Sequence, residues 1–117
     1  MRPRFVMAGA ALMTITAVGE TQALGFATYF AVLGGNGTVA TSSGVASSVR
    51  TGPGVYEVAF NRPIVGCALV ATINGAKAGF ASVAHKAGSP TTVTVSTFTT
   101  RGVASNLPFT VLITCNS

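Results

Sequence analysis

The chain is short of ionisable side chains. Its 117 residues include two acidic residues, seven basic residues, one histidine, two cysteines and no tryptophan. Two cysteines are too few for a disulfide-rich scaffold, and 14 glycines are too few for a collagen-like repeat. Hydrophobic residues make up 49% of the chain, which excludes disorder caused by a lack of apolar side chains. The length predicts a single domain.

This scarcity also limits the chemistry that the chain can perform. Beyond residue 23, Glu57 is the only acid and His85 the only histidine. Catalysis by paired carboxylates is therefore excluded for a monomer, and the ligand sets of zinc and calcium sites cannot be assembled convincingly. The residues needed for a Ser–His–Glu relay are present in the composition, but no Gly-x-Ser-x-Gly elbow is present. We predict a non-enzymatic protein without metal or cofactor.

The first 23 residues have the pattern of a secretory signal peptide. Arg2 and Arg4 precede an uncharged, mostly apolar stretch at 5–18, and small residues occupy the −3 and −1 positions of a cleavage site at 21–23. The alternative is a retained membrane anchor, but the stretch is shorter than the ~20 residues that span a bilayer. We predict cleavage after Ala23, no transmembrane segment in the mature chain, and a secreted, periplasmic or cell-surface location.

Residues 24–117 are predicted to form one all-β domain. Apolar and polar residues alternate with period 2, as in 55–60, where Tyr56, Val58 and Phe60 share one face. Turn signals separate the runs, and no segment has a helical apolar period. We expect a single antiparallel β-sandwich or jelly roll of about seven or eight short strands. The predicted strands are 28–33, 45–51, 55–60, 67–73, 80–85, 92–98 and 109–115. Of these, 67–73 is nearly all apolar, which predicts burial on both faces.

The two cysteines can form only one pair. Export implies an oxidising compartment, so we predict a disulfide between Cys67 and Cys115 that fastens the C-terminal strand. The alternative is a pair of buried free thiols.

Three segments of the chain carry a resemblance to a known family. They are G-V-Y-E-V-A-F at 54–60, G-C-A-L-V-A-T at 66–72 and P-F followed by five residues and a cysteine at 108–115. Together they resemble a small uncharacterised family of bacterial exported β domains with paired cysteines. The resemblance covers about residues 29–115 and implies a single β domain with a cysteine pair. The family has no agreed activity, so the resemblance implies no catalytic residue.

The basic excess makes a polyanion a candidate partner. After residue 23 there are five basic residues and one acidic residue, Glu57, which gives a net charge of +4. Because antiparallel strands reverse direction, Arg50, Lys77 and Arg101 are expected at one end of the domain. The other two basic residues, Arg62 and Lys86, are expected at the opposite end.

Aromatic residues decide which binding functions the sequence favours. A sugar site needs an exposed aromatic with polar neighbours, so the candidate ligand-binding residues are Tyr29, Tyr56, Arg50, Lys77 and Arg101. The phenylalanines of the strands are expected in the core, which argues against nucleic-acid binding; they are Phe60, Phe80, Phe98 and Phe109.

The leading functional prediction is an exported non-enzymatic structural or interaction domain. The alternative is a carbohydrate- or polyanion-binding module. Few charges are available to cover the surface or to protect open strand edges, which favours a homo-oligomer or a surface partner. The apolar segment 24–33 is expected to pair as the first strand of its own sheet or to contact another molecule.

Overall fold

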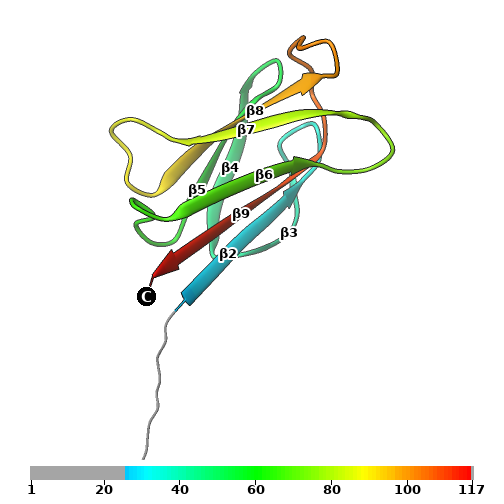
Figure 1. Cartoon of the computed structure of the whole chain (residues 1–117). Coiled ribbons are helices and arrows are strands. Elements are labelled where there is room, and N and C mark those ends of the chain that lie inside the picture. Colours follow the sequence, from blue (N-terminus) through cyan, green and yellow to red (C-terminus); the bar gives the residue numbers. More distant parts are fainter. Residues whose placement is uncertain (1–25, 117) are drawn as a thin grey trace, which may run out of the picture.

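Two four-stranded antiparallel sheets pack face to face to form a sandwich (Figure 1). The computed structural model describes residues 26–116, so the predicted signal peptide lies outside the described residues. Sheet I has the order β3-β2-β9-β6, and sheet II has the order β4-β5-β8-β7. This architecture confirms the predicted all-β class.

The chain passes back and forth between the two sheets. Sheet I contains β2 (Phe26–Leu33), β3 (Val39–Ser43), β6 (Ala68–Ile73) and β9 (Phe109–Asn116). Sheet II contains β4 (Val45–Gly52), β5 (Val55–Phe60), β7 (Gly79–His85) and β8 (Thr92–Thr99). Residues 26–116 include no helix with the length and apolar character needed to cross a membrane.

All seven predicted strands are present, with ends within two residues of the predicted ones. The strand that the sequence pattern did not reveal is β3. Its residues Val39–Ser43 include only two apolar side chains, and nearly the whole strand is exposed at the edge of sheet I. An edge strand with a solvated surface has little apolar alternation to reveal it.

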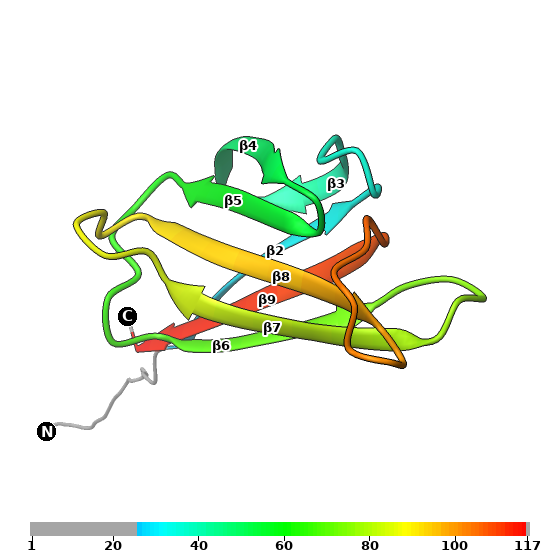
Figure 2. The same cartoon turned by 90° about the horizontal axis from the view of Figure 1, so that it is seen from above.

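The chain path distinguishes a sandwich from a jelly roll. The hairpins β2–β3, β4–β5 and β7–β8 each lie within one sheet, and the remaining connections cross between the sheets. Strand β9 returns to lie between β2 and β6. Figure 2 shows the resulting two layers, with the β2–β3, β6–β7 and β8–β9 loops at one end and the C-terminus at the other.

The core lies between the inward faces of the two sheets. Tyr56 and Val58 of β5 meet Phe109 and Val111 of β9, all fully buried. The rings of Tyr56 and Phe109 have centroids 4.8 Å apart and are tilted by 55°. These apolar contacts join the sheets, because alternate residues of each strand are removed from water together.

Strand β6 departs from its predicted burial. The expectation that 67–73 is buried on both faces is wrong. Leu69, Ala71 and Ile73 pack against the core, whereas the side chain of Val70 is 57% exposed on the outer surface. The reason is that β6 is an edge strand of an antiparallel sheet, and nothing in the described chain covers the outer face of that sheet.

Gly44 lets the chain pass from β3 in sheet I to β4 in sheet II. Its φ is +81°, in the left-handed region that favours glycine. A Cβ atom at this position would lie 2.5 Å from Cδ1 of Tyr29. The chain therefore bends tightly around the Tyr29 ring.

Candidate functional site

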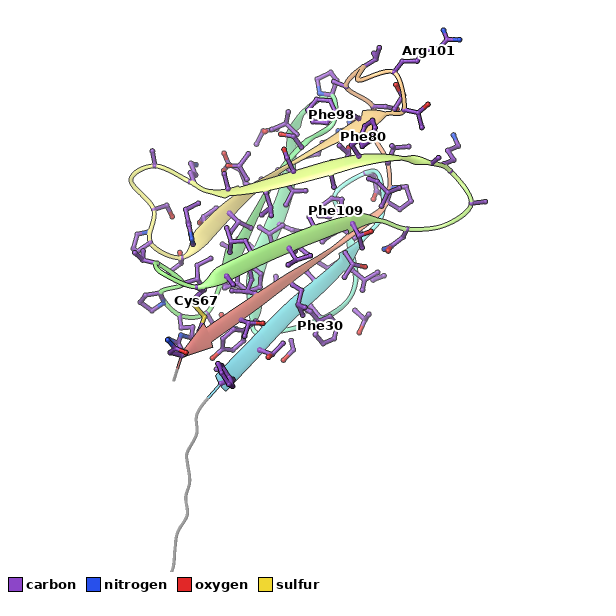
Figure 3. The ribbon with its side chains drawn as sticks, viewed as in Figure 1. Phe30, Cys67, Phe80, Phe98, Arg101 and Phe109 are labelled. Atoms are coloured by element: carbon purple, nitrogen blue, oxygen red, sulfur yellow. A yellow bond between two sulfur atoms is a disulfide. The ribbon has the colours of Figure 1, made fainter. Side chains whose placement is uncertain are left out.

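The predicted disulfide between Cys67 and Cys115 is present (Figure 3). The two Cα atoms are 4.5 Å apart, within the range that a disulfide bridge allows. Cys115 is buried on the inward face of β9, and Cys67 directly precedes β6. The bridge therefore joins the last strand to the start of its neighbour β6, and it is compatible with an oxidising extracellular compartment.

The two tyrosines are held by the protein itself. Tyr56 was predicted as a ligand-binding residue, and this is wrong because its side chain is fully buried. Its hydroxyl donates a 2.7 Å hydrogen bond to the carbonyl oxygen of Gly35. Tyr29 is partly buried, and its hydroxyl accepts a hydrogen bond from Nη1 of Arg62 at 3.1 Å. The Arg62 guanidinium also lies 5.6 Å from the centroid of the Tyr29 ring. The two tyrosine hydroxyls therefore have Gly35 and Arg62 as their partners, and none of the candidate residues Arg50, Lys77 and Arg101.

The three predicted basic residues are all exposed but lie on different segments. Arg50 is near the end of β4, Lys77 lies in the β6–β7 loop, and Arg101 lies at the tip of the loop after β8, as Figure 3 shows. Arg50 also lines an open groove of about 620 Å³ between β3 and β4, together with Asn36, Thr38, serines and small apolar residues such as Val39 and Val45. This groove has no aromatic side chain among its lining residues.

The few groups capable of acid–base chemistry do not converge. Glu57 lies on the outer side of β5, where its carboxylate accepts a 2.9 Å hydrogen bond from Nζ of Lys86. His85 is exposed at the end of β7. Within residues 26–116, no hydrogen bond joins His85 to Glu57 or to a serine, and no three potential metal ligands gather. The non-enzymatic character of the chain stays a prediction.

The outer face of sheet I, called face I, carries no ionisable side chain on its described strand residues. Phe30, Leu112 and Val70 are cross-strand neighbours and form one apolar row across β2, β9 and β6. Leu112 is 39% exposed and Val70 is 57% exposed. Small, polar and further apolar residues surround the row: Phe26, Thr28, Val32, Thr41, Ser43, Ala68, Thr72, Thr110, Thr114 and Asn116.

The outer face of sheet II, called face II, has a different character. It carries the Glu57–Lys86 ion pair and a cross-strand pair formed by Phe80 of β7 and Phe98 of β8. The expectation that Phe80 and Phe98 pack in the core is wrong: both lie on the outer face, where the side chain of Phe80 is 57% exposed and that of Phe98 is half-buried. The alternation of the sequence contained this signal, since Phe80 shares its face with Ser82 and Ala84 and not with Val83.

Comparison with known proteins gives no further assignment: no protein-family model, curated protein or solved structure matches the chain. The two outer faces are therefore the features from which a function can be argued.

Proposed function

We propose that this protein is an exported, non-enzymatic interaction domain that pairs with a second copy of itself through face I. The observation that carries the proposal is the charge-free outer surface of sheet I. None of its four strands contains Asp, Glu, Lys, Arg or His, and the apolar row Phe30–Leu112–Val70 crosses its centre. A surface of this kind can be buried in an interface without leaving a charged group unpaired.

Charge placement favours a second copy as the partner. Each molecule carries a net charge of +4 over residues 24–117, so most contacts between copies would bring like charges together. In a pairing through face I, the Glu57–Lys86 pairs of the two copies would be separated by three sheet spacings, roughly 30 Å. This exceeds the ~8 Å Debye length at physiological ionic strength, so their interaction is screened.

The residue pattern of face I is also complementary to itself. The apolar row lies between a row of Thr28, Thr114 and Ala68 and a row of Val32, Thr110 and Thr72. A two-fold axis running along β9 through Leu112 would place Phe30 of one copy on Val70 of the other. Each row would then face its own equivalent, and threonine hydroxyls can both donate and accept hydrogen bonds.

The size of face I sets the expected affinity. The axis along β9 places β2, β9 and β6 of the two copies face to face, whereas β3 extends beyond the overlap. These three strands contain 22 residues, which at about 4.8 by 3.4 Å each give an area of roughly 350 Å² per copy. Two such faces bury about 700 Å², below the ~1,000 Å² of a stable specific interface. We therefore expect a weak dimer whose formation depends on protein concentration.

The experiment measures mass by light scattering over a range of concentrations, using the oxidised protein purified after secretory expression. The mass should rise from monomer towards dimer with concentration. Val70→Lys on face I should keep the protein monomeric, because it would bury an unpaired ammonium. Ala84→Lys, on the outer side of β7, is the matched control and should behave like the wild type. A wild-type mass that stays monomeric, or equal effects of the two lysines, would contradict the proposal.

A cross-linking experiment tests the predicted axis. Leu112→Cys places a thiol on the two-fold axis, so a short bismaleimide should link two copies through it. Ser82→Cys, on face II, should give no cross-linked dimer above background. Cross-linking from position 82 alone would place the interface on the other side of the sandwich.

A further inference from the structure

Face II has an aromatic pair near the loop end of the sandwich, formed by the exposed Phe80 and the half-buried Phe98. Phe80 and Phe98 lie directly opposite each other on β7 and β8, and Figure 3 shows both near the loop that bears Arg101. Cross-strand neighbours have Cβ atoms ~5 Å apart, so the two rings form one apolar ledge. Val103, which is 60% exposed, follows in the adjoining turn, where Ala104 bridges to Phe98. Such a ledge on a face with few other apolar groups is a candidate binding surface.

Two cations lie in the loops that adjoin the ledge strands, Lys77 before β7 and Arg101 after β8. Lys77 precedes Phe80 by three residues, and Arg101 follows Phe98 by three residues. The turn that carries Arg101 is held by hydrogen bonds from the Thr99 amide to the Val103 carbonyl and from the Gly102 amide to the Thr99 carbonyl, at 2.8 and 2.9 Å. The ion pair formed within residues 26–116 joins Lys86 to Glu57, so Lys77 and Arg101 have no acidic partner in the described chain.

We infer that this ledge binds an anionic polysaccharide. The apolar C–H face of a sugar ring would pack on Phe80 and Phe98. A carboxylate or sulfate on the polymer would pair with Lys77 and Arg101. The next cross-strand pair on the same face is Ser82 and Ser96, whose hydroxyls can exchange hydrogen bonds with sugar hydroxyls. The ledge and face I lie on opposite sides of the sandwich, so binding at one leaves the other free.

Single-stranded nucleic acid is the competing ligand class, because its bases also stack on aromatic side chains. The surroundings of the ledge favour the polysaccharide. Nucleic-acid grooves follow a phosphate backbone with many basic residues, whereas only two cations lie in the loops that adjoin the ledge strands. The strand residues of face II, as described, include no aromatic besides Phe80 and Phe98 on which a longer run of bases could stack.

The test measures binding of polygalacturonate, a uniformly charged uronic acid polymer, to the oxidised protein by titration calorimetry. Neutral dextran and an oligo-dT of similar length are the comparison probes. We expect polygalacturonate to bind more tightly than either, and we expect its affinity to fall with added salt. Failure to bind polygalacturonate, or tighter binding of oligo-dT, would overturn the inference.

Variants locate the binding on the ledge. Phe80→Leu keeps an apolar side chain but removes the ring, and it should weaken polygalacturonate binding about tenfold. Lys77→Ala combined with Arg101→Ala should weaken it by a similar factor and reduce its salt dependence. Val65→Ala, which removes an apolar side chain that is 70% exposed, and Lys86→Ala, both at the other end of the domain, should leave the affinity unchanged. Equal losses in the ledge and control variants would overturn the inference.

Discussion

The two sheets of this sandwich are alike on the inside and different on the outside. Both contribute inward rows of apolar residues, such as Val58 in β5 and Val111 in β9, to one core. On the outside, face I has no ionisable group on its described strand residues, whereas face II carries the Glu57–Lys86 pair and the phenylalanine ledge. The outward residues of each strand contribute little to the core, so their character can differ between the two sheets without disturbing the packing that joins them.

The two sheets also differ in how they are held. Sheet I has a covalent tie at β9, because Cys115 is bonded to Cys67 just before β6. Sheet II relies on backbone pairing, core contacts and one exposed ion pair. This contrast can be tested with variants that each remove one of the stabilising interactions.

Loss of the disulfide should have the largest effect on stability. Replacing both cysteines with serine opens a bridge with a sequence separation of 48, for which the chain-entropy relation gives about 4 kcal/mol. We expect this loss in the free energy of urea unfolding. Amides of β9 and β6 should also exchange with deuterium sooner than those of β5 and β8. A loss below about 1 kcal/mol, or uniform exchange in both sheets, would contradict the contrast.

The turn at Gly44, which connects β3 of sheet I to β4 of sheet II, should show the next largest loss of stability when it is mutated. Gly44→Ala forces an L-residue into φ +81° and places its Cβ against the Tyr29 ring, so we expect a loss of about 3 kcal/mol. Gly66→Ala is the control, since Gly66 has φ +82° but no atom within 4 Å of the added Cβ. It should lose only about 1–2 kcal/mol. If the two variants unfold at the same urea concentration, the contact with Tyr29 has no measurable cost.

The hydrogen bond from Tyr56 to the Gly35 carbonyl, which links the two sheets, should have the third largest effect on stability. Tyr56→Phe leaves the ring packed on Phe109 but removes the donor to the Gly35 carbonyl, with an expected loss of about 1–2 kcal/mol. Tyr29→Phe also removes a hydroxyl, but one that is partly exposed and bonded to Arg62, so its loss should be under about 0.5 kcal/mol. Thermal unfolding of both variants gives the comparison. The reverse order would show that Tyr29 is the more important link.

The ion pair on face II should contribute least. Glu57→Gln removes it, and the exposed fractions of Lys86 and Glu57 are 42% and 28%. Exposed pairs of this kind contribute about 0.2–1 kcal/mol. A double-mutant cycle with Lys86→Gln, repeated at high salt, measures the coupling, which should decrease as salt is added. A coupling that is larger than this range and insensitive to salt would show that the pair is shielded from solvent.

The sequence was sufficient to predict seven of the eight described strands and the cysteine pairing. Period-2 alternation placed β5 at its observed bounds, because a pleated strand sends successive side chains to opposite faces. Two cysteines allow a single intramolecular pairing, so the bridge between Cys67 and Cys115 needed no knowledge of the fold. Reversal of antiparallel strands likewise predicted that the β6–β7 and β8–β9 loops, which carry Lys77 and Arg101, lie at the same end of the sandwich (Figure 2).

Only the tertiary structure decided what covers each face. Alternation shows that Phe80 and Ser82 share a side, but it does not tell whether another sheet lies over that side. The same holds for the outer residues of β6, and for Tyr56, whose burial depends on Phe109 from a strand far away in the sequence. Strand β3 likewise forms because β2 offers it a backbone partner. Burial depends on contacts between distant segments, and these contacts exist only once the two sheets have packed together.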